Sequence, residues 1–297
     1  MSTPTSKRKI FFSISAVLLV ISIVFLFING LNLGIDFTGG TLLEFNLGDT
    51  EFDKNVEAEI RDIVAKHSDN AETVVQETGN NGVSIKTIPL SNEKRDAIKD
   101  DVLAKYSLTE DSVLIMENVD GTVSGRLIGD SLKAIFLAVI LMLLYITIRF
   151  DFQSGTCAVI ALVHDVLIML GAYAIFGFTV STSFIAAILT IVGYSINATI
   201  IIFDRVRENN RTMKKATPDQ IADNAITASY LRAINSSITT LFTIGVLYVM
   251  GVDSIKEFAL PIIIGIVAGT YSSLFIAGPF WAMWKGGKAT AGQKKSK

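Results

Sequence analysis

The chain has 297 residues, half of them hydrophobic, and a formal net charge of −2. One cysteine, Cys157, excludes an internal disulfide, and the two histidines are too few and too scattered for a metal site. We therefore expect no metal, no cofactor and, at this charge, no nucleic-acid partner.

Apolar runs of about 18 or more residues predict six membrane-spanning helices, because that is the length needed to cross a bilayer. The first run could be a cleaved signal peptide, but no clear small-x-small cleavage site follows it, which favours an uncleaved anchor. The predicted spans are 10–28, 130–149, 155–177, 183–203, 234–252 and 258–284.

Charge divides the chain sharply. Residues 30–125 hold 19 acidic and 8 basic side chains, whereas the remainder holds 9 acidic and 18 basic ones. The basic residues gather in 1–9, at Arg149, in the loop 204–233 and in the tail 285–297. Six consecutive spans put these four clusters on one side, which the positive-inside rule makes the cytoplasm. Segment 30–125 is then extracytoplasmic, with both termini cytoplasmic.

The polar segment predicts a ferredoxin-like α+β domain. Strands at 41–47, 72–77, 83–90 and 112–116 alternate with helices at 51–67 and 91–106 in the order β-α-β-β-α-β, and Gly79–Gly82 forms the hairpin turn. Glycine-rich linkers enter and leave the domain, and they could be hinges or tight packed turns. Their candidate residues are Asp36, Gly39, Gly40, Gly121 and Gly125.

Ionisable residues inside spans are candidate functional groups. Asp165 lies near the middle of the third span beside His164, where the pair could move ions or fix helix packing. Polar residues also follow one face of the fourth span and one face of the fifth. These faces could line a hydrated path or hydrogen-bond to other helices. Their members are Asn197 and Asp204 on the fourth span, and Arg232, Ser236, Thr239 and Thr243 on the fifth.

Two further patterns concern packing. Gly265 and Gly269 on the sixth span form a Gly-xxx-Gly pair that favours close helix contact. Thr217-Pro-Asp-Gln220 predicts the start of a separate helix over 221–231, which we expect along the cytoplasmic membrane surface.

Three separated motifs resemble the SecF proteins of the SecD/SecF family, membrane subunits of the bacterial protein-export machinery. They are Leu33-Gly-Ile-Asp-Phe-Thr-Gly-Gly40, Ala161-Leu-Val-His-Asp-Val166 and the segment 190–209, which contains Gly-Tyr-Ser-Ile-Asn. The resemblance implies a six-span half of an RND-superfamily transporter. Such a half pairs with SecD in a twelve-helix unit, binds the SecYEG channel and uses the proton-motive force to help export preproteins.

One position departs from the family pattern. SecF-like proteins commonly carry an aspartate directly after the asparagine of Gly-Tyr-Ser-Ile-Asn, as the proposed proton carrier, and here that position is Ala198. Arg232, which matches the family's partner arginine, remains.

Two other functions stay open at this point: a stand-alone exporter of lipids or small molecules, and an assembly factor that transports nothing. We do not expect an enzyme, because no nucleophile–base or metal constellation is present in the sequence.

Overall fold

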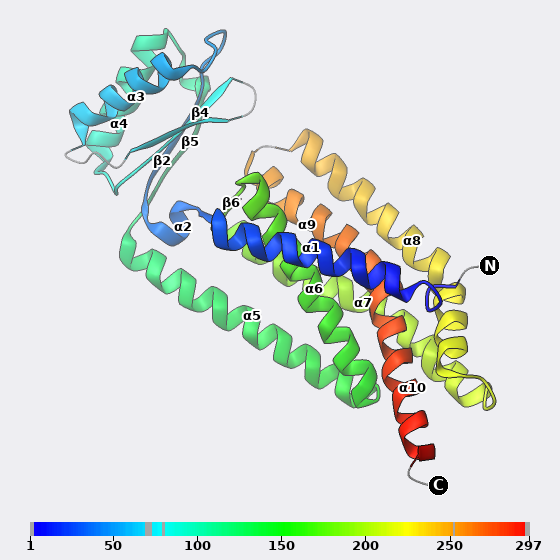
Figure 1. Cartoon of the computed structure of the whole chain (residues 1–297). Coiled ribbons are helices and arrows are strands. Elements are labelled where there is room, and N and C mark those ends of the chain that lie inside the picture. The colour runs from blue at the N-terminus through cyan, green and yellow to red at the C-terminus, as the bar shows by residue number, and fades with distance from the viewer. Residues whose placement is uncertain (1–2, 69–72, 79–80, 252, 295–297) are drawn as a thin grey trace. The chain divides into compact units, whose positions relative to one another are not determined.

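The computed structural model describes residues 3–68, 73–78, 81–251 and 253–294. The chain divides into two compact units, one formed by Met1–Asn32 with Leu132–Lys297 and the other by Leu33–Ser131. The first unit consists of long helices, and the second of a small sheet with two helices (Figure 1). The second unit, Leu33–Ser131, which we call the polar unit, is thus inserted directly after the first long helix.

The polar unit has the predicted ferredoxin-like order. Its four-stranded sheet is antiparallel, with the order β3-β4-β2-β5, and α3 and α4 cover one face (Figure 1). The predicted turn Gly79–Gly82 falls partly outside the described residues. The elements are α2 (Ile35–Thr38), β2 (Gly40–Asn46), α3 (Lys54–His67), β3 (Val74–Thr78), β4 (Gly82–Thr87), α4 (Asn92–Tyr106), the 3₁₀ turn Glu110–Ser112 and β5 (Val113–Val119).

Alternation along the strands and a helical stripe build the core of this unit. Leu43 and Phe45 on β2 are fully buried, and Val56, Ile60 and Val64 on α3 recur at helical spacing against them. The helix α3 begins three residues later than predicted. The reason is the Asp53 carboxylate, which accepts hydrogen bonds from the backbone N–H groups at positions 55 and 56 and so caps the helix.

Among the described residues, six helical segments are long and apolar enough to cross a membrane, as predicted. They are α1 (Arg8–Ile28), α5 (Gly121–Arg149), α6 (Phe152–Phe176), α7 (Thr182–Thr212), α8 (Pro218–Met250) and Ile255–Gly286. The last of these comprises most of α9 (Asp253–Ser272), the π-helical turn Ser273–Ala277 and part of α10 (Gly278–Lys294). Short strands are β1 (Asn32–Leu33) and β6 (Thr179–Val180).

The structure differs from the predicted surface helix at 221–231 and from the long loop 204–233. The helix α8 is continuous from Pro218 to Met250, and α7 continues to Thr212, so the connection between them is short. The predicted capping box is present at Thr217, and no glycine or further proline interrupts the helix before Gly245. Ile221 and Ile226 are buried against the bundle, which holds this part of α8 in the bundle.

The helix α9 packs against α7, α6 and α8 at the centre of the membrane unit (Figure 1). A Cβ on Gly265 would lie 2.5 Å from Ile191 Cγ1, and one on Gly269 would lie 3.0 Å from the Ser195 Cβ. Larger residues at these positions would push α9 away from α7. The Gly-xxx-Gly pair therefore permits the close helix contact that the spacing predicts.

Candidate functional site

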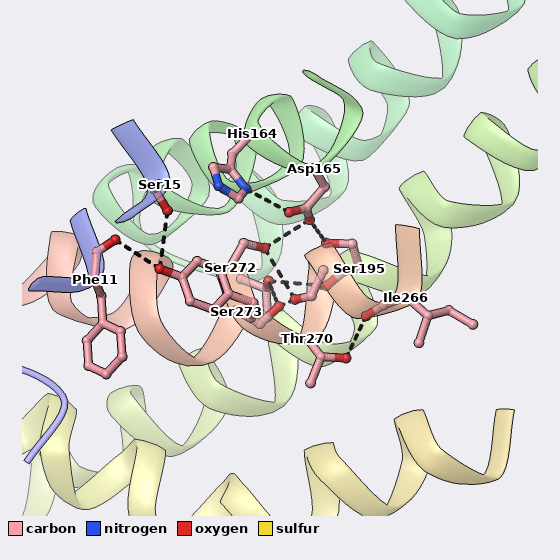
Figure 2. A network of polar contacts seen from close by, with 12 residues as sticks. Phe11, Ser15, His164, Asp165, Ser195, Ile266, Thr270, Ser272 and Ser273 are labelled. Atoms are coloured by element: carbon pink, nitrogen blue, oxygen red, sulfur yellow. Dashed lines mark hydrogen bonds and ion pairs between the residues drawn. The ribbon is translucent and has the colours of Figure 1, made fainter. Parts of the chain in front are cut away.

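Asp165 lies at the centre of a buried polar network in the middle of the helical bundle (Figure 2). Its Oδ2 accepts hydrogen bonds from Ser195 Oγ on α7 at 2.6 Å and from Ser272 Oγ on α9 at 2.9 Å. Its Oδ1 lies 3.1 Å from His164 Nδ1. One carboxylate therefore joins three helices, and both of its oxygens have partners, as a buried ionisable group requires.

The network extends to α1 through Tyr271. The Tyr271 ring stacks on the His164 imidazole with 6.2 Å between ring centroids, and its hydroxyl donates to the Phe11 carbonyl of α1 at 2.9 Å. Ser15 Oγ lies 3.5 Å from the same hydroxyl (Figure 2). The predicted pair of His164 and Asp165 is thus packed among α1, α6, α7 and α9.

A second set of polar contacts binds α7, α8 and α9 together. Thr199 Oγ1 on α7 lies 2.8 Å from Ser273 Oγ in the π-helical turn. Ser237 Oγ on α8 lies 2.6 Å from Thr270 Oγ1 on α9, and the Tyr194 hydroxyl donates to the Thr240 hydroxyl at 3.3 Å. These hydroxyls stabilise contacts between helices.

The predicted polar face of the fifth span lies on the outer surface of this chain. Ser236, Thr239 and Thr243 on α8 are exposed. The Thr239 hydroxyl donates to the Ser236 carbonyl, and the Thr243 hydroxyl to the Thr239 carbonyl, so both hydrogen bonds stay within the helix. In the described part of the chain, these threonine hydroxyls form no hydrogen bond to another helix.

Beside this face, α7 and α8 form a polar groove of about 430 Å³. Three of the predicted residues, Asn197, Asp204 and Arg232, are exposed and line it together. Asp204 also forms an ion pair with Arg149 at 3.2 Å. Arg232 forms no ion pair with a carboxylate in the described part of the chain. We call the exposed set Asn197, Asp204, Arg232, Ser236, Thr239 and Thr243 the α7–α8 polar face.

Ala198 is buried, although its neighbour Asn197 is exposed. A methyl group therefore stands where related proteins commonly carry a carboxylate. Among the residues whose burial is described, the buried carboxylate is that of Asp165, on a different helix.

The two glycine-rich linkers of the polar unit pack against each other. Gly39 has a φ of 72°, and a Cβ there would lie 3.1 Å from the Gly121 Cα. Gly40 has a φ of 130°, and a Cβ there would lie 2.5 Å from the Thr87 carbonyl oxygen. Both positions require glycine. This geometry favours the packed turn over the hinge, the two readings that the sequence leaves open.

The remaining linker residues complete this turn. Ser124 Oγ donates to the Ile35 carbonyl at 3.2 Å, which ties the start of α5 to α2. The Asp120 carboxylate accepts from the Thr122 hydroxyl and backbone N–H, and these bonds lower the pKa of Asp120. Asp36 lies in α2, whereas Gly125 on α5 has open space at its Cα.

Sequence patterns missed half of the buried network. Ser272 and Ser273 are fully buried, and Ser237 and Thr270 face each other between helices. The available signal was the run Thr270-Tyr-Ser-Ser273 inside an apolar span, since four consecutive polar residues are costly in lipid unless they meet other helices. No group of three or more His, Cys, Asp or Glu in the described ranges could hold a metal ion.

Comparisons with known proteins agree with this architecture. The family model "Protein export membrane protein SecD/SecF, C-terminal" matches residues 99–287, and the "SecD/SecF GG Motif" matches residues 24–51. The protein translocase subunit SecF of Sebaldella termitidis is 34% identical over 291 residues, covering 97% of this chain and 94% of that protein. The SecF of Haemophilus influenzae is 35% identical and covers 91% and 82%.

In larger relatives, the region similar to this chain makes up only part of the protein. The protein translocase subunit SecDF of Bacillus subtilis is 33% identical over 95% of this chain, which spans 38% of that protein. The crystal structure of SecDF from Thermus thermophilus, described as a translocon-associated membrane protein, superposes with a TM-score of 0.84 at 30% identity. The superposition covers 95% of this chain and 38% of the SecDF chain.

Six apolar helices with an α+β unit inserted after the first define a multi-pass membrane protein of the protein-export class. The chain belongs to the SecD/SecF family. Its relatives are named protein translocase subunits, which gives it an accessory role in Sec-dependent protein transport in the cytoplasmic membrane.

Proposed function

We propose that this chain is the SecF half of a SecD–SecF unit that promotes preprotein export through the SecYEG channel, driven by the proton-motive force. The observation that carries the proposal is the α7–α8 polar face. Polar and ionisable groups are costly against lipid, so they belong against protein or a hydrated path. In this chain the face has no covering helix in the described residues, and a partner bundle would provide one.

The fused relatives support a partner of the SecD type. This chain matches 38% of the Bacillus subtilis SecDF, whose name joins both subunits in one polypeptide. A two-part unit agrees with transporters built from parallel repeats, in which binding sites lie at the repeat interface. The α7–α8 polar face is the surface of this chain best suited to that interface.

Use of the proton gradient is assigned mainly to the partner subunit. Position 198 holds an alanine, which cannot bind a proton, and Arg232 faces the α7–α8 groove without a carboxylate partner in the described residues. A partner carboxylate opposite Arg232 would complete an ion pair across the interface. Asp165 and His164 then serve to fix the packing of α1, α6, α7 and α9.

The orientation follows from the charge pattern. The N-terminal segment contacts the start of α8, where Arg8 forms an ion pair with Asp219 at 3.0 Å, which supports placing both on one membrane side. The basic clusters make that side the cytoplasm. Segment 30–125 is then extracytoplasmic, where it would meet the emerging preprotein.

Co-expression and transport measurements test the proposal. The chain should co-purify with a SecD-type subunit, and the complex should increase export by reconstituted SecYEG only when a proton gradient is present. A self-sufficient homodimer would instead indicate an exporter of lipids or small molecules. A complex that stabilises the channel without changing export would indicate an assembly factor. We propose no catalytic activity.

A further inference from the structure

A small recess lies where the ends of α6, α7 and α10 meet, and none of its lining residues belongs to the α7–α8 polar face. It has a volume of about 140 Å³ and polar or charged groups from all three helices. Its lining residues include Asp151 at the N-cap of α6, Ser154 on α6, Arg207 and Asn210 on α7, and Trp281 and Lys285 on α10.

The charges of this recess favour an anion. Arg207 and Lys285 form no ion pair with a carboxylate among the described residues, and Arg207 donates instead to the Arg149 carbonyl at 3.2 Å. Asp151 contributes one negative charge and accepts a hydrogen bond from Ser154 Oγ. One positive charge remains. The recess also adjoins the N-terminus of α6, whose free N–H groups favour negative charge.

A buried donor in the lining has no acceptor. Trp281 is 1% exposed, and its Nε1 has no hydrogen-bond partner in the described part of the chain. Buried polar groups are almost always hydrogen-bonded, so an unpaired N–H indicates a missing acceptor. Lys285 Nζ lies over the same ring, 5.2 Å from its centroid, which places a cation over this indole.

We propose that this recess binds the phosphate of an anionic phospholipid headgroup. A phosphate offers acceptor oxygens to Arg207, Lys285 and Asn210, and to the Trp281 N–H, which has no partner among the described residues. A lipid source is favoured over soluble phosphate, because the recess lies at the ends of membrane helices beside an exposed apolar side chain. Phe152, which directly follows Asp151, is 69% exposed and offers surface to acyl chains. Basic pockets at helix ends commonly bind lipid headgroups.

Native mass spectrometry of the full-length chain in neutral detergent tests this proposal. Phosphatidylglycerol, diacylglycerol with the same acyl chains, and inorganic phosphate are titrated separately. Phosphatidylglycerol should bind in preference to both other probes. Arg207→Gln and Lys285→Gln should each weaken it about tenfold or more, the loss expected for one charge-assisted hydrogen bond. Lys214→Gln removes the same charge from an exposed site outside the recess and should leave binding unchanged.

A second measurement does not depend on these variants folding. The chain has two tryptophans, so Trp284→Phe leaves Trp281 as the sole indole reporter. Brominated phosphatidylglycerol should quench Trp281 fluorescence more strongly than brominated diacylglycerol. Equal quenching, equal weakening by Lys214→Gln, or binding of inorganic phosphate as tight as that of the lipid would each overturn the proposal. Neither readout requires export activity, so both are independent of the Sec assignment.

Discussion

Replacing Asp165 by alanine removes the acceptor at the centre of the buried network. Three polar atoms lose their partner: Ser195 Oγ, Ser272 Oγ and His164 Nδ1. Ser272 Oγ also lies 3.2 Å from the Gly269 carbonyl and keeps an acceptor there. The other two are buried without a substitute. At about 1–3 kcal/mol for each buried polar atom left without a partner, the free energy of unfolding should fall by about 2–6 kcal/mol.

Unfolding of the full-length chain by sodium dodecyl sulfate in mixed micelles, followed by far-ultraviolet circular dichroism, measures this loss. Asp204→Ala is the matched control, since it removes an exposed carboxylate whose ion pair with Arg149 is worth about 1 kcal/mol or less. In the double variant Asp165→Ala/Ser195→Ala the orphaned hydroxyl is gone. The summed losses in unfolding free energy of Asp165→Ala and Ser195→Ala should therefore exceed the loss in the double variant by about 1–3 kcal/mol.

The reasoning would be refuted if Asp165→Ala destabilised the chain no more than Asp204→Ala does. Simple additivity of the two single variants would also contradict it, because it would mean that Asp165 and Ser195 do not act together.

Three other predictions follow from the charge pattern and the sites. In intact cells, a cysteine at Thr50 should react with an impermeant thiol reagent and one at Asn210 should not; labelling at Asn210 would reverse the orientation. Asp165→Asn should lower the yield of the assembled complex together with export, whereas an intact complex without any response to the gradient would make Asp165 a proton carrier. Backbone hydrogen bonds hold the pKa of Asp53 below its usual value. The cap should therefore stabilise the polar unit fully above the usual pKa, and this stabilisation should be lost as pH falls through the lowered pKa of the folded state. Asp53→Asn, which keeps a capping oxygen, should remove this contribution to the acid unfolding curve of residues 33–131, and an unchanged pH dependence would count against it.

The sequence predicts most of the fold because the relevant signals are local. Six apolar runs fix the spans, and a change from long apolar runs to short amphipathic elements marks the inserted unit. The predicted helix boundaries are less accurate where a cluster of charged residues was expected to end a helix. Arg205 and Glu208 follow the apolar part of α7, but they are good helix formers and pair with each other at 2.6 Å, so the helix continues to Thr212.

The candidate site was predictable only in part, because helical periodicity defines a face but not what the face meets. Ser236, Thr239 and Thr243 do share one face of α8, and that face is exposed in this chain. The neighbouring positions Ser237 and Thr240 are the ones that contact α7 and α9. Their roles depend on which other helices α8 packs against, and the spacing of residues along one helix does not predict that.

Site-specific photo-crosslinking in the membrane tests most directly whether the α7–α8 polar face meets a partner subunit. A photoreactive residue at Thr239, which is exposed on that face, is compared with one at Val163, which is 51% exposed in the groove between α1 and α6. The proposal predicts an adduct with the SecD-type subunit from Thr239 and none from Val163. An adduct from Val163 alone, or from Thr239 to a second copy of this chain, would contradict it.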